Sequence, residues 1–316
     1  MSGSKEGEDE GGTGHDTAGC CGAGPELPSR VLPWSRFHYR AVQAVTPGVA
    51  MGDVRVEVEG PITTIWMDRP DRRNAVDRAM AGELRAAFEE FEADPDQRVA
   101  VLAGSGGTFC AGADLTAAGD PERRNELDPE GGGGGPMGPT RMLLGKPLIA
   151  AIGGYAVAGG LELALLADLR IVESDAVLGV FCRRWGVPLI DGGTVRLPRI
   201  VGLGRALDMI LTGRPVRAEE ALAIGLANRV VEPGRAVAAA RELAGQIAAF
   251  PFDCVLADRA STYAALDLPL AEALRAEGAA GVPIVEREGV AGAARFAAGA
   301  GRHGVFPAHP SGPGPA

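Results

Sequence analysis

The chain has 316 residues, of which 46% are hydrophobic, and a formal net charge of −10 at pH 7. This length and apolar content can support one large domain or two modest ones, each with a buried core. The acidic balance argues against nucleic acid as a partner, and no apolar run approaches the ~20 residues that a membrane span requires.

Cysteine and histidine are placed in ways that exclude further classes of protein. No two cysteines form a C-x-x-C pair, and the four histidines lie near the ends of the chain: His15, His38, His303 and His309. This usage is typical of a reducing compartment, so we expect a cytoplasmic protein with no disulfide framework, no metal site and no bound cofactor. The acidic N-terminus resembles neither a secretory signal nor a transit peptide.

The first 50 residues differ in composition from the rest of the chain. Residues 1–50 begin with Gly, Ser, Glu and Asp and continue with scattered Pro, so they bury too little apolar area to offset their ordering entropy. We expect a disordered N-terminal extension, in which the less polar 31–39 is a candidate docking segment. Translation from Met51 is a second explanation, and the sequence does not separate the two. The tail 301–316 also has a disordered composition.

The ordered sequence opens with strands and one amphipathic helix. Alternating valines over 54–58, a Gly-Pro turn and the β-rich run 62–67 predict a hairpin. Apolar residues at helical spacing then predict a helix over 76–91. The run 99–102 predicts a short strand that leads into the glycine-rich loop 104–115.

A charged segment follows. Residues 116–140 include five consecutive glycines and hold too few apolar residues for a core element. We expect a flexible segment between two glycine loops.

The stretch 146–170 is the most informative part of the sequence. The apolar run 148–152 predicts a buried strand, and a glycine pair leads into 161–169, which is apolar on nearly every face. A helix that is apolar all round is a buried helix, so Glu162 lies in the first turn of one. Burying an ionised carboxylate costs several kcal/mol unless it is paired or placed for chemistry. Glu162 is therefore a candidate functional residue.

The remainder of the chain predicts short strands and then a helical region. Strands are expected over 170–172 and 176–180, and Asp191 with the two glycines after it predicts a turn. Helices are expected over 205–211, 218–225, 236–250 and 251–265, and a last pair of helices within 270–298. We therefore divide the ordered chain into a core, 51–215, and a helical C-terminal region, 216–300.

Two glycine-rich loops, each after a short strand, present backbone N–H groups with little side chain in the way. Such donors can stabilise a developing oxyanion, and the candidates are the N–H groups of Ala113 and Gly159. Glycines in the stretch 148–169 do not have the G-x-G-x-x-G spacing of a dinucleotide fold. The sequence has neither a G-x-x-x-x-G-K-[ST] loop nor a G-x-S-x-G elbow, which argues against nucleoside triphosphate binding and a Ser-His-Asp triad.

Three segments in a fixed order carry a resemblance to a known family. TFCAGADL (108–115), KPLIAAIGGYAVAGGLELALLADLRI (146–171) and GVPLIDGGTVRLPRIVGLGRALDMILTGRPVRAEEALAIGLANRVV (186–231) resemble the crotonase family, the enoyl-CoA hydratase and isomerase superfamily. The resemblance covers roughly 52–300. It implies an α/β fold, a crotonase-like spiral of ββα units with a helical C-terminal part, assembled as homotrimers or dimers of trimers. It also implies an acyl-CoA thioester as the small-molecule partner and an enolate held on the thioester oxygen.

The resemblance assigns roles to particular positions. Ala113 and Gly159 match the two oxyanion donors, and Glu162 matches the first catalytic glutamate of the hydratases. The position of the second family glutamate is Cys182, which would then contact substrate. A thiol with a pKa near ~8.5 is mostly protonated at neutral pH and is a poor substitute for a carboxylate. Asp191 matches an acidic position of the dienoyl-CoA isomerases and the aroyl-CoA dehalogenase branch, so it is the candidate second proton-transfer group.

Each carboxylate also has a structural interpretation. Glu162 could instead form an ion pair with Arg170 or Lys146. Asp191 could cap its own turn or the helix after it, where Asp before Gly is common.

The resemblance also places the CoA moiety across an arginine-containing turn. The residues expected beside it are Arg72, Arg73, Asn74, Ala75, Ala111 and Asp114. The arginines would offer positive charge to the phosphates, or would simply keep an exposed turn soluble.

These assignments favour an enoyl-CoA hydratase-like lyase that adds water to a 2-enoyl-CoA. Because Cys182 replaces one glutamate, an enoyl-CoA or dienoyl-CoA isomerase is an alternative. A catalytically degenerate paralogue that binds acyl-CoA is another.

Overall fold

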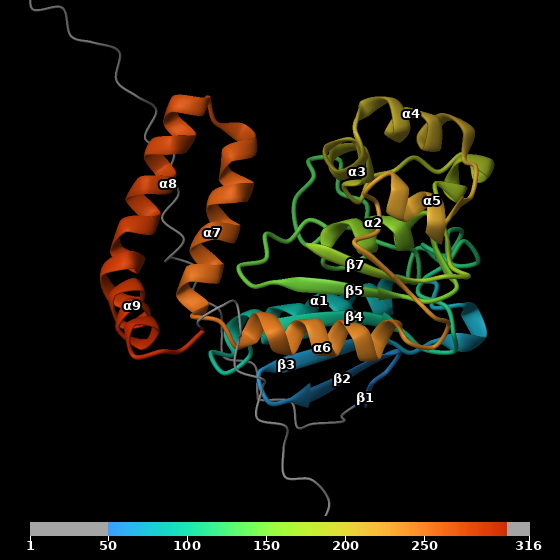
Figure 1. The fold of residues 1–316 in the computed structure, drawn as a ribbon. Helices are drawn as coiled ribbons and strands as arrows, with labels where there is room; N and C mark the ends of the chain where they lie inside the picture. The colour runs from blue at the N-terminus through green and yellow to red at the C-terminus, as the bar shows by residue number, and fades with distance from the viewer. Residues whose placement is uncertain (1–49, 302–316) are drawn as a thin grey trace, which may run out of the picture. The chain divides into compact units, whose positions relative to one another are not determined.

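The structure of the protein is a computed structural model that describes residues 50–301. The expectations for 1–49 and 302–316 lie outside the described residues. In the described part, helices cover both faces of a sheet of mostly parallel strands (Figure 1). The predicted α/β class is confirmed.

Strands of the described residues form two sheets. The main sheet has the order β1 (Ala50–Met51), β2 (Val54–Glu59), β3 (Ile62–Met67), β4 (Val99–Gly104), β5 (Leu148–Ile152), β7 (Leu169–Glu173) and β10 (Arg229–Val231). The pairs β1–β2 and β2–β3 are antiparallel, and the later neighbours are parallel. The second sheet has the order β6 (Tyr155–Val157), β8 (Val177–Gly179) and β9 (Val216–Arg217).

Helices connect and follow these strands. They are α1 (Arg78–Ala93), α2 (Gly159–Leu166), α3 (Gly193–Val201), α4 (Leu203–Thr212), α5 (Ala218–Ala223), α6 (Ala236–Ala248), α7 (Phe252–Ala264), α8 (Leu270–Ile284) and α9 (Val290–Ala297). Shorter helical turns cover Pro70–Arg72, Phe181–Trp185, Ala265–Asp267 and Val285–Gly289. No helix of the described residues has the length and apolar character needed to cross a membrane.

The central strand β4 is buried on both faces, which explains its continuous apolar sequence. Ala100 and Leu102 pack into the cluster that contains buried residues of α1 and α2. Val99, Val101 and Ala103 pack into a second cluster with α6, which lies in front of the sheet in Figure 1. Successive side chains of a strand point to opposite faces, so a strand covered by helices on both sides is apolar at every position.

The buried helix α2 ends three residues earlier than predicted, because the chain returns to the sheet. The N–H of Asp168 donates to the carbonyl of Leu148 (2.9 Å), and the N–H of Leu148 donates to the Asp168 carboxylate (2.8 Å). These bonds join the chain to β5 and start β7 at Leu169. A buried helix and a buried strand are both apolar, so the pattern of the sequence does not show where one gives way to the other.

Other elements also differ from prediction. Val76 precedes α1 instead of lying on it, because Asp77 caps the helix by accepting a hydrogen bond from the N–H of Met80 (3.3 Å). The helix α3 follows the predicted turn directly, and the predicted elements gave it no bounds. Strands β6 and β10 have three residues each, too few for a periodic pattern.

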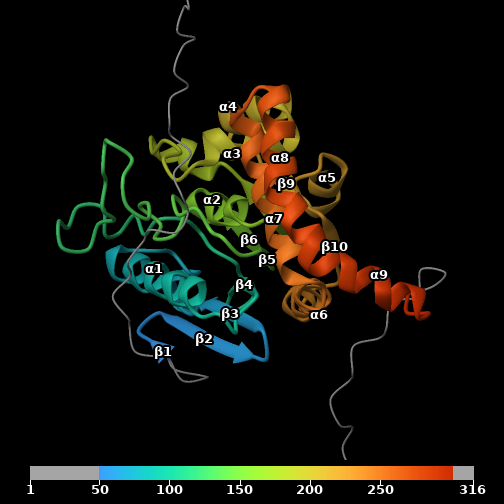
Figure 2. The same cartoon turned by 90° about the vertical axis from the view of Figure 1, so that its left-hand side faces the viewer.

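The C-terminal helices lie close to their predicted positions, but this region is not separate from the core. Strand β10 pairs with β7, and α6 covers one face of the main sheet. Figures 1 and 2 show α7 and α8 running side by side, and the two helices make contact. The boundary at 215 therefore crosses the core fold.

We expect Gly160→Ala to destabilise the protein. A Cβ on Gly160 would lie 2.2 Å from the carbonyl oxygen of Cys110, at the buried start of α2. Backbone at that distance must shift, and we expect the free energy of unfolding to fall by about 2–3 kcal/mol in urea titrations. Gly82→Ala is the matched control, because no atom lies within 4 Å of its added Cβ in α1 and alanine should stabilise that helix by about 0.5–1 kcal/mol. Equal effects of the two substitutions would contradict this packing argument.

Candidate active site

The two glycine loops are joined by backbone pairing. The N–H of Cys110 donates to the carbonyl of Tyr155 (2.8 Å), and the N–H of Val157 donates to the carbonyl of Cys110 (3.1 Å). Gly112 has a φ of +98°, and a Cβ there would lie 2.9 Å from the Ala158 methyl and 3.1 Å from the Gly159 nitrogen. The two loops are therefore in contact close to both predicted donors.

The N–H groups of Ala113 and Gly159 are available to a ligand. The N–H of Val76 donates to Gly112 and the N–H of Asp114 donates to Val76, each at 2.9 Å, so the chain is held on both sides of Ala113. Among the described residues, neither predicted donor N–H has an acceptor. Gly159 is the first residue of α2, where the helix itself offers no partner. Both residues line one cavity of about 280 Å³.

Ala158 makes a sharp turn immediately before Gly159. Its backbone has φ 55° and ψ −127°, a conformation that favours glycine, and its N–H donates to the carbonyl of Gly179 (2.9 Å). Such a backbone costs on the order of 1–3 kcal/mol and persists only where neighbours hold it. No sequence pattern indicated this strained backbone, which lies directly beside a predicted donor.

Glu162 is 3% exposed, and its carboxylate faces the loop before α3. Its Oε1 accepts hydrogen bonds from the N–H of Asp191 (2.9 Å) and of Gly193 (2.8 Å). Burial raises the pKa of Glu162 to about 7, the charge of Asp191 adds to the rise, and these two N–H bonds oppose it. A carboxyl with this pKa can both take and release a proton at neutral pH.

The ion-pair interpretation of Glu162 is wrong. Lys146 donates to the carbonyls of Phe91 (2.7 Å) and Asp94 (2.6 Å). The Arg170 guanidinium is bound by carbonyl oxygens of Ala167 and Leu226 and by the Asn228 side chain.

Asp191 is 4% exposed and lines the same cavity as Glu162. Its Oδ1 accepts hydrogen bonds from the N–H of Met137 (2.9 Å) and from the Thr140 hydroxyl. Burial raises the pKa of Asp191, although these hydrogen bonds oppose the rise. Helix α3 has Gly192 as its N-cap and no side-chain cap, so the capping interpretation of Asp191 is wrong.

Cys182 lies at the cavity wall, 7% exposed, in the turn Phe181–Trp185. Burial raises the pKa of its thiol, and the charge of Glu162 raises it further. The thiol is therefore protonated at neutral pH and does not replace the family's second glutamate as a base.

The predicted CoA residues have different environments. Arg72 and Arg73 are exposed, and Ala111 lines the cavity and donates its N–H to the Arg73 carbonyl (3.0 Å). Asn74 is a correction: it is fully buried, its Oδ1 accepts the N–H of Arg69, and its amide group donates to loop carbonyls at Ser105, Thr108 and Phe109. Its side chain therefore holds the turn together and does not face a ligand.

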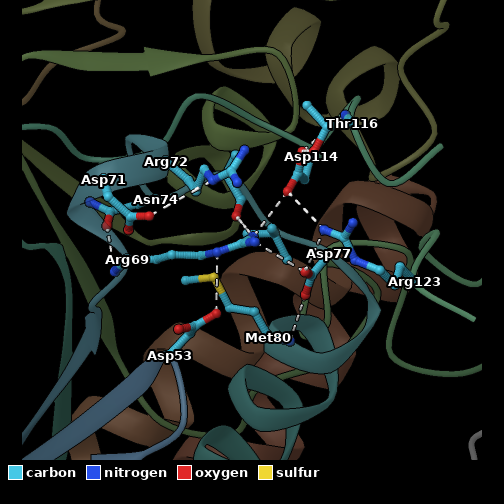
Figure 3. A network of polar contacts seen from close by, with 12 residues as sticks. Asp53, Arg69, Asp71, Arg72, Asn74, Asp77, Met80, Asp114, Thr116 and Arg123 are labelled. Carbon is cyan, nitrogen blue, oxygen red and sulfur yellow. Dashed lines mark hydrogen bonds and ion pairs between the residues drawn. The ribbon is translucent and has the colours of Figure 1, made fainter. Parts of the chain in front are cut away.

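Asp114 lines the cavity, and its carboxylate contacts Thr116, Arg69 and Arg123 (Figure 3). Its contact with CoA stays a prediction. Ala75 is partly buried, and its carbonyl accepts a hydrogen bond from Arg69 (2.9 Å). The turn and the oxyanion loop are thus parts of one polar network.

Sequence reasoning missed the residues that hold Asp191 in place. Arg196 donates to the carbonyls of Asp191 (3.1 Å) and Thr140 (2.7 Å), linking α3 to the segment that binds the Asp191 carboxylate. Within 116–140 the part 134–140 is largely buried, contrary to the expectation that the segment contributes nothing to the core. Its mobility stays a prediction. An arginine one turn after the Asp191-Gly-Gly turn could have indicated the role of Arg196, whereas no sequence feature indicated that of Thr140.

Two backbone donors beside a buried carboxyl that titrates near neutrality suit an enzyme that stabilises an oxyanion and moves a proton. Comparison with known proteins identifies the family. A model of the Enoyl-CoA hydratase/isomerase family matches residues 57–289. The chain belongs to this family, and the resemblance noted in the sequence is confirmed.

Individual relatives agree with this assignment. The chain is 42% identical over 196 residues to a carnitinyl-CoA dehydratase of Salmonella arizonae, covering 61% of this chain and 74% of the relative. It is 41% identical over 197 residues to a carnitinyl-CoA dehydratase of Proteus mirabilis, covering 62% and 74%. A solved enoyl-CoA hydratase of Mycobacterium tuberculosis H37Rv superposes with a TM-score of 0.73 at 34% identity, covering 78% of this chain and 96% of that one. The predicted crotonase-like fold is confirmed.

The raised pKa of Glu162 predicts a pH-dependent stability. A carboxyl whose pKa is about 7 in the folded state and near 4.5 when unfolded makes the protein less stable as pH rises between these values. Glu162→Gln removes this charge while its amide oxygen can still accept both N–H bonds. We expect the variant to exceed the parent in free energy of unfolding by on the order of 2–3 kcal/mol at pH 8, and by much less at pH 4.5. Denaturant titrations at both pH values measure this, and a difference that is independent of pH would refute the assignment.

Proposed function

We propose that this protein catalyses the reversible addition of water to a 2-enoyl-CoA, forming a 3-hydroxyacyl-CoA. The observation that carries the proposal is Glu162, a buried carboxyl with a pKa of about 7, in the same cavity as the free N–H groups of Ala113 and Gly159. Family membership supplies the acyl-CoA class of substrate, and the names of the dehydratase relatives agree with this type of reaction.

In this mechanism the thioester oxygen accepts hydrogen bonds from Ala113 and Gly159, which polarise the conjugated double bond. Glu162 removes a proton from water while the water oxygen bonds to C3, and the electron pair of the double bond moves to the thioester as an enolate. Asp191, whose pKa is raised by burial, donates a proton to C2 and closes the enolate to product. Proton return from Glu162 through solvent resets the pair, and the reverse sequence is dehydration.

Isomerisation is the second candidate, favoured by the replacement of one family glutamate by Cys182. Moving a double bond along the acyl chain needs one carboxyl to take a proton and return it at a second carbon, and it needs no water. Glu162 and Asp191 both line the cavity and both have raised pKa values, so they suit this reaction as well. A degenerate acyl-CoA-binding protein would bind without turnover.

The acyl group is a separate question. The relatives named carnitinyl-CoA dehydratase suggest an acyl chain that carries a quaternary ammonium. The cavity lining includes the acidic residues Asp114, Glu162 and Asp191 and the aromatic residues Phe181 and Trp185, groups that attract such a cation. We therefore include carnitinyl-CoA among the substrates to be tested.

We also propose self-association, as trimers or dimers of trimers, and a cytoplasmic location, following the family resemblance and the cysteine usage. The C-terminal helices carry exposed apolar side chains that a partner subunit could cover: Leu270, Leu274, Val285, Val290 and Phe296. Light scattering of the purified chain measures the mass. A monomer at micromolar concentration would contradict the assembly.

The experiment that separates these reactions is incubation with acyl-CoA substrates in heavy water. Crotonyl-CoA, a 3-enoyl-CoA and carnitinyl-CoA are followed by mass and by product identity. A hydratase adds water to crotonyl-CoA, a carnitinyl-CoA dehydratase removes water from its substrate, and an isomerase moves the double bond of the 3-enoyl-CoA. Binding of all three without turnover would refute catalysis.

We expect Glu162→Gln to lower kcat by at least about 10³-fold, because an amide does not accept the proton. Glu92→Gln is the matched control: Glu92 also accepts two backbone N–H bonds, from Gly145 and Lys146, and burial also raises its pKa, but it does not line the cavity. Its turnover should equal that of the parent. Full activity of Glu162→Gln would exclude Glu162 as the base.

Asp191→Asn tests the second proton-transfer group. We expect kcat to fall by about 10²–10⁴-fold while binding of a saturated acyl-CoA is retained, since the donor of the C2 proton is lost. Steady-state rates and exchange of the C2 hydrogen with heavy water measure the two effects. Unchanged kinetics would show that Asp191 has a purely structural role.

A further inference from the structure

Arg69 lies at the centre of a partly buried ionic cluster next to the oxyanion loop. It follows β3, its side chain is 12% exposed, and its guanidinium contacts carboxylates of Asp53 (3.3 Å), Asp77 (3.3 Å) and Asp114 (3.2 Å). Figure 3 shows Arg69 among these three acids, which come from separate parts of the chain. The same guanidinium donates to the carbonyl of Ala75 (2.9 Å).

Of these three acids, Asp114 is the one that can affect the oxyanion donor, because it follows Ala113 and lines the cavity. Its side chain is 4% exposed. One oxygen, Oδ1, accepts hydrogen bonds from the N–H (3.0 Å) and hydroxyl (2.6 Å) of Thr116. The other, Oδ2, is buried with no hydrogen bond, and it is held by the charges of Arg69 and, at 3.7 Å, Arg123.

The backbone around Ala113 rests on the same turn that Arg69 braces. The backbone of Val76 accepts a hydrogen bond from the N–H of Asp114 and donates one to the carbonyl of Gly112. Val76 therefore fixes the backbone on both sides of the donor Ala113. Arg69 binds the residue before Val76 through its carbonyl and Asp77 after it through its carboxylate. The Arg69 guanidinium thus holds both the turn around Val76 and Asp114, the residue after Ala113.

We propose that Arg69 is a positioning residue of the oxyanion hole, which acts through Asp114 and the turn at Val76 to aim the N–H of Ala113 at the thioester oxygen. This inference rests on the proposed function and adds a residue to it. Oxyanion stabilisation depends on donors held at hydrogen-bond distance from the place where charge develops, so a small displacement of Ala113 reduces the rate strongly.

Arg69 also has an electrostatic effect at this place. Burial alone would raise the pKa of Asp114, but Thr116 and the two arginines outweigh it and lower the pKa, so the carboxylate stays charged. A charged Asp114 without Arg69 would place an inadequately balanced anion one residue from the donor. An enolate forming there would then be opposed by a like charge.

The test uses the full-length protein with Arg69→Lys, Arg69→Met, Asp114→Asn and the double variant Arg69→Met/Asp114→Asn. Arg55→Met is the control, because Arg55 also bridges two acids, Glu57 and Asp68, but lies on β2 outside the cavity wall. The readouts are kcat and KM for whichever acyl-CoA is turned over, and the infrared carbonyl band of a bound, ¹³C-labelled thioester. Circular dichroism of each variant measures folding.

We expect Arg69→Met to lower kcat by about 30-fold or more with KM within about threefold, and to shift the carbonyl band back toward its position in solution. Arg69→Lys should recover part of both effects, since it keeps the charge beside Asp114. The double variant should be no worse than Arg69→Met, because the two residues act through one link. Arg55→Met should match the parent in all readouts.

The inference fails if folded Arg69→Met keeps the parent's carbonyl band, or if the losses of Arg69→Met and Asp114→Asn simply add. If Arg69→Met does not fold, Arg69→Lys decides: an unshifted band and unchanged kcat would overturn the inference. Failure of the proposed function looks different. In that case the parent protein adds no water to crotonyl-CoA in heavy water, whereas the carbonyl band of a bound thioester still reports on Arg69.

Discussion

The burial of Glu162 at the start of α2 constrains the whole site. Its carboxylate is nearly inaccessible, and it accepts hydrogen bonds from the N–H groups of Asp191 and Gly193, which lie just before and at the start of α3. A Cβ on Gly193 would lie 2.9 Å from the Glu162 Oε1, so this position leaves no room for a side chain. The Glu162 carboxylate therefore holds the start of α3 against α2 through these two hydrogen bonds.

A consequence of this arrangement is that Asp191 cannot cap α3 in the ordinary way. Its N–H is used by Glu162, and its side chain turns to Thr140 and the N–H of Met137. Arg196 then ties the carbonyls of Asp191 and Thr140 together. The end of the charged, glycine-rich segment thereby becomes part of the acid-holding framework, whereas its earlier part, 118–133, is mostly exposed. The segment 116–140, which has the composition of a loop, is thus buried at its C-terminal end, where it binds the Asp191 carboxylate.

The parts of the site that follow from local sequence were predictable. Glycine-rich loops after strands indicated the candidate donors Ala113 and Gly159, whose N–H groups lie in one cavity, and the apolar helix around Glu162 predicted that its carboxyl is buried. The same reasoning failed for the side chain of Asn74, because the direction of a side chain that leaves a turn depends on groups from other parts of the chain that contact it. Those groups lie more than thirty residues away for Asn74. Element boundaries failed for a related reason, since burial makes helix and strand alike in composition.

Residues that act through other residues leave the weakest trace in a sequence. Arg69 occupies an exposed-looking turn, Thr140 ends a glycine-rich segment, and Arg196 lies on a helix that periodicity did not reveal. Arg69 and Asp114 are 45 residues apart in the sequence, and Thr140 and Asp191 are 51 residues apart. Only folding brings these side chains together, so no local sequence pattern could assign their roles.

Three carboxyls around one cavity differ in their proton affinity because their neighbours differ. Glu162 and Asp191 have burial as the dominant influence, and the pKa of each is raised. Asp114 is buried as well, but Thr116, Arg69 and Arg123 lower its pKa and keep it anionic. Environments that separate the pKa values of nearby acids also separate their roles, because only a group that titrates near the working pH can carry a proton in both directions. Glu162, with a pKa of about 7, is therefore suited to proton transfer in both directions. Asp114 is suited to hold the backbone whose N–H donates to the developing charge.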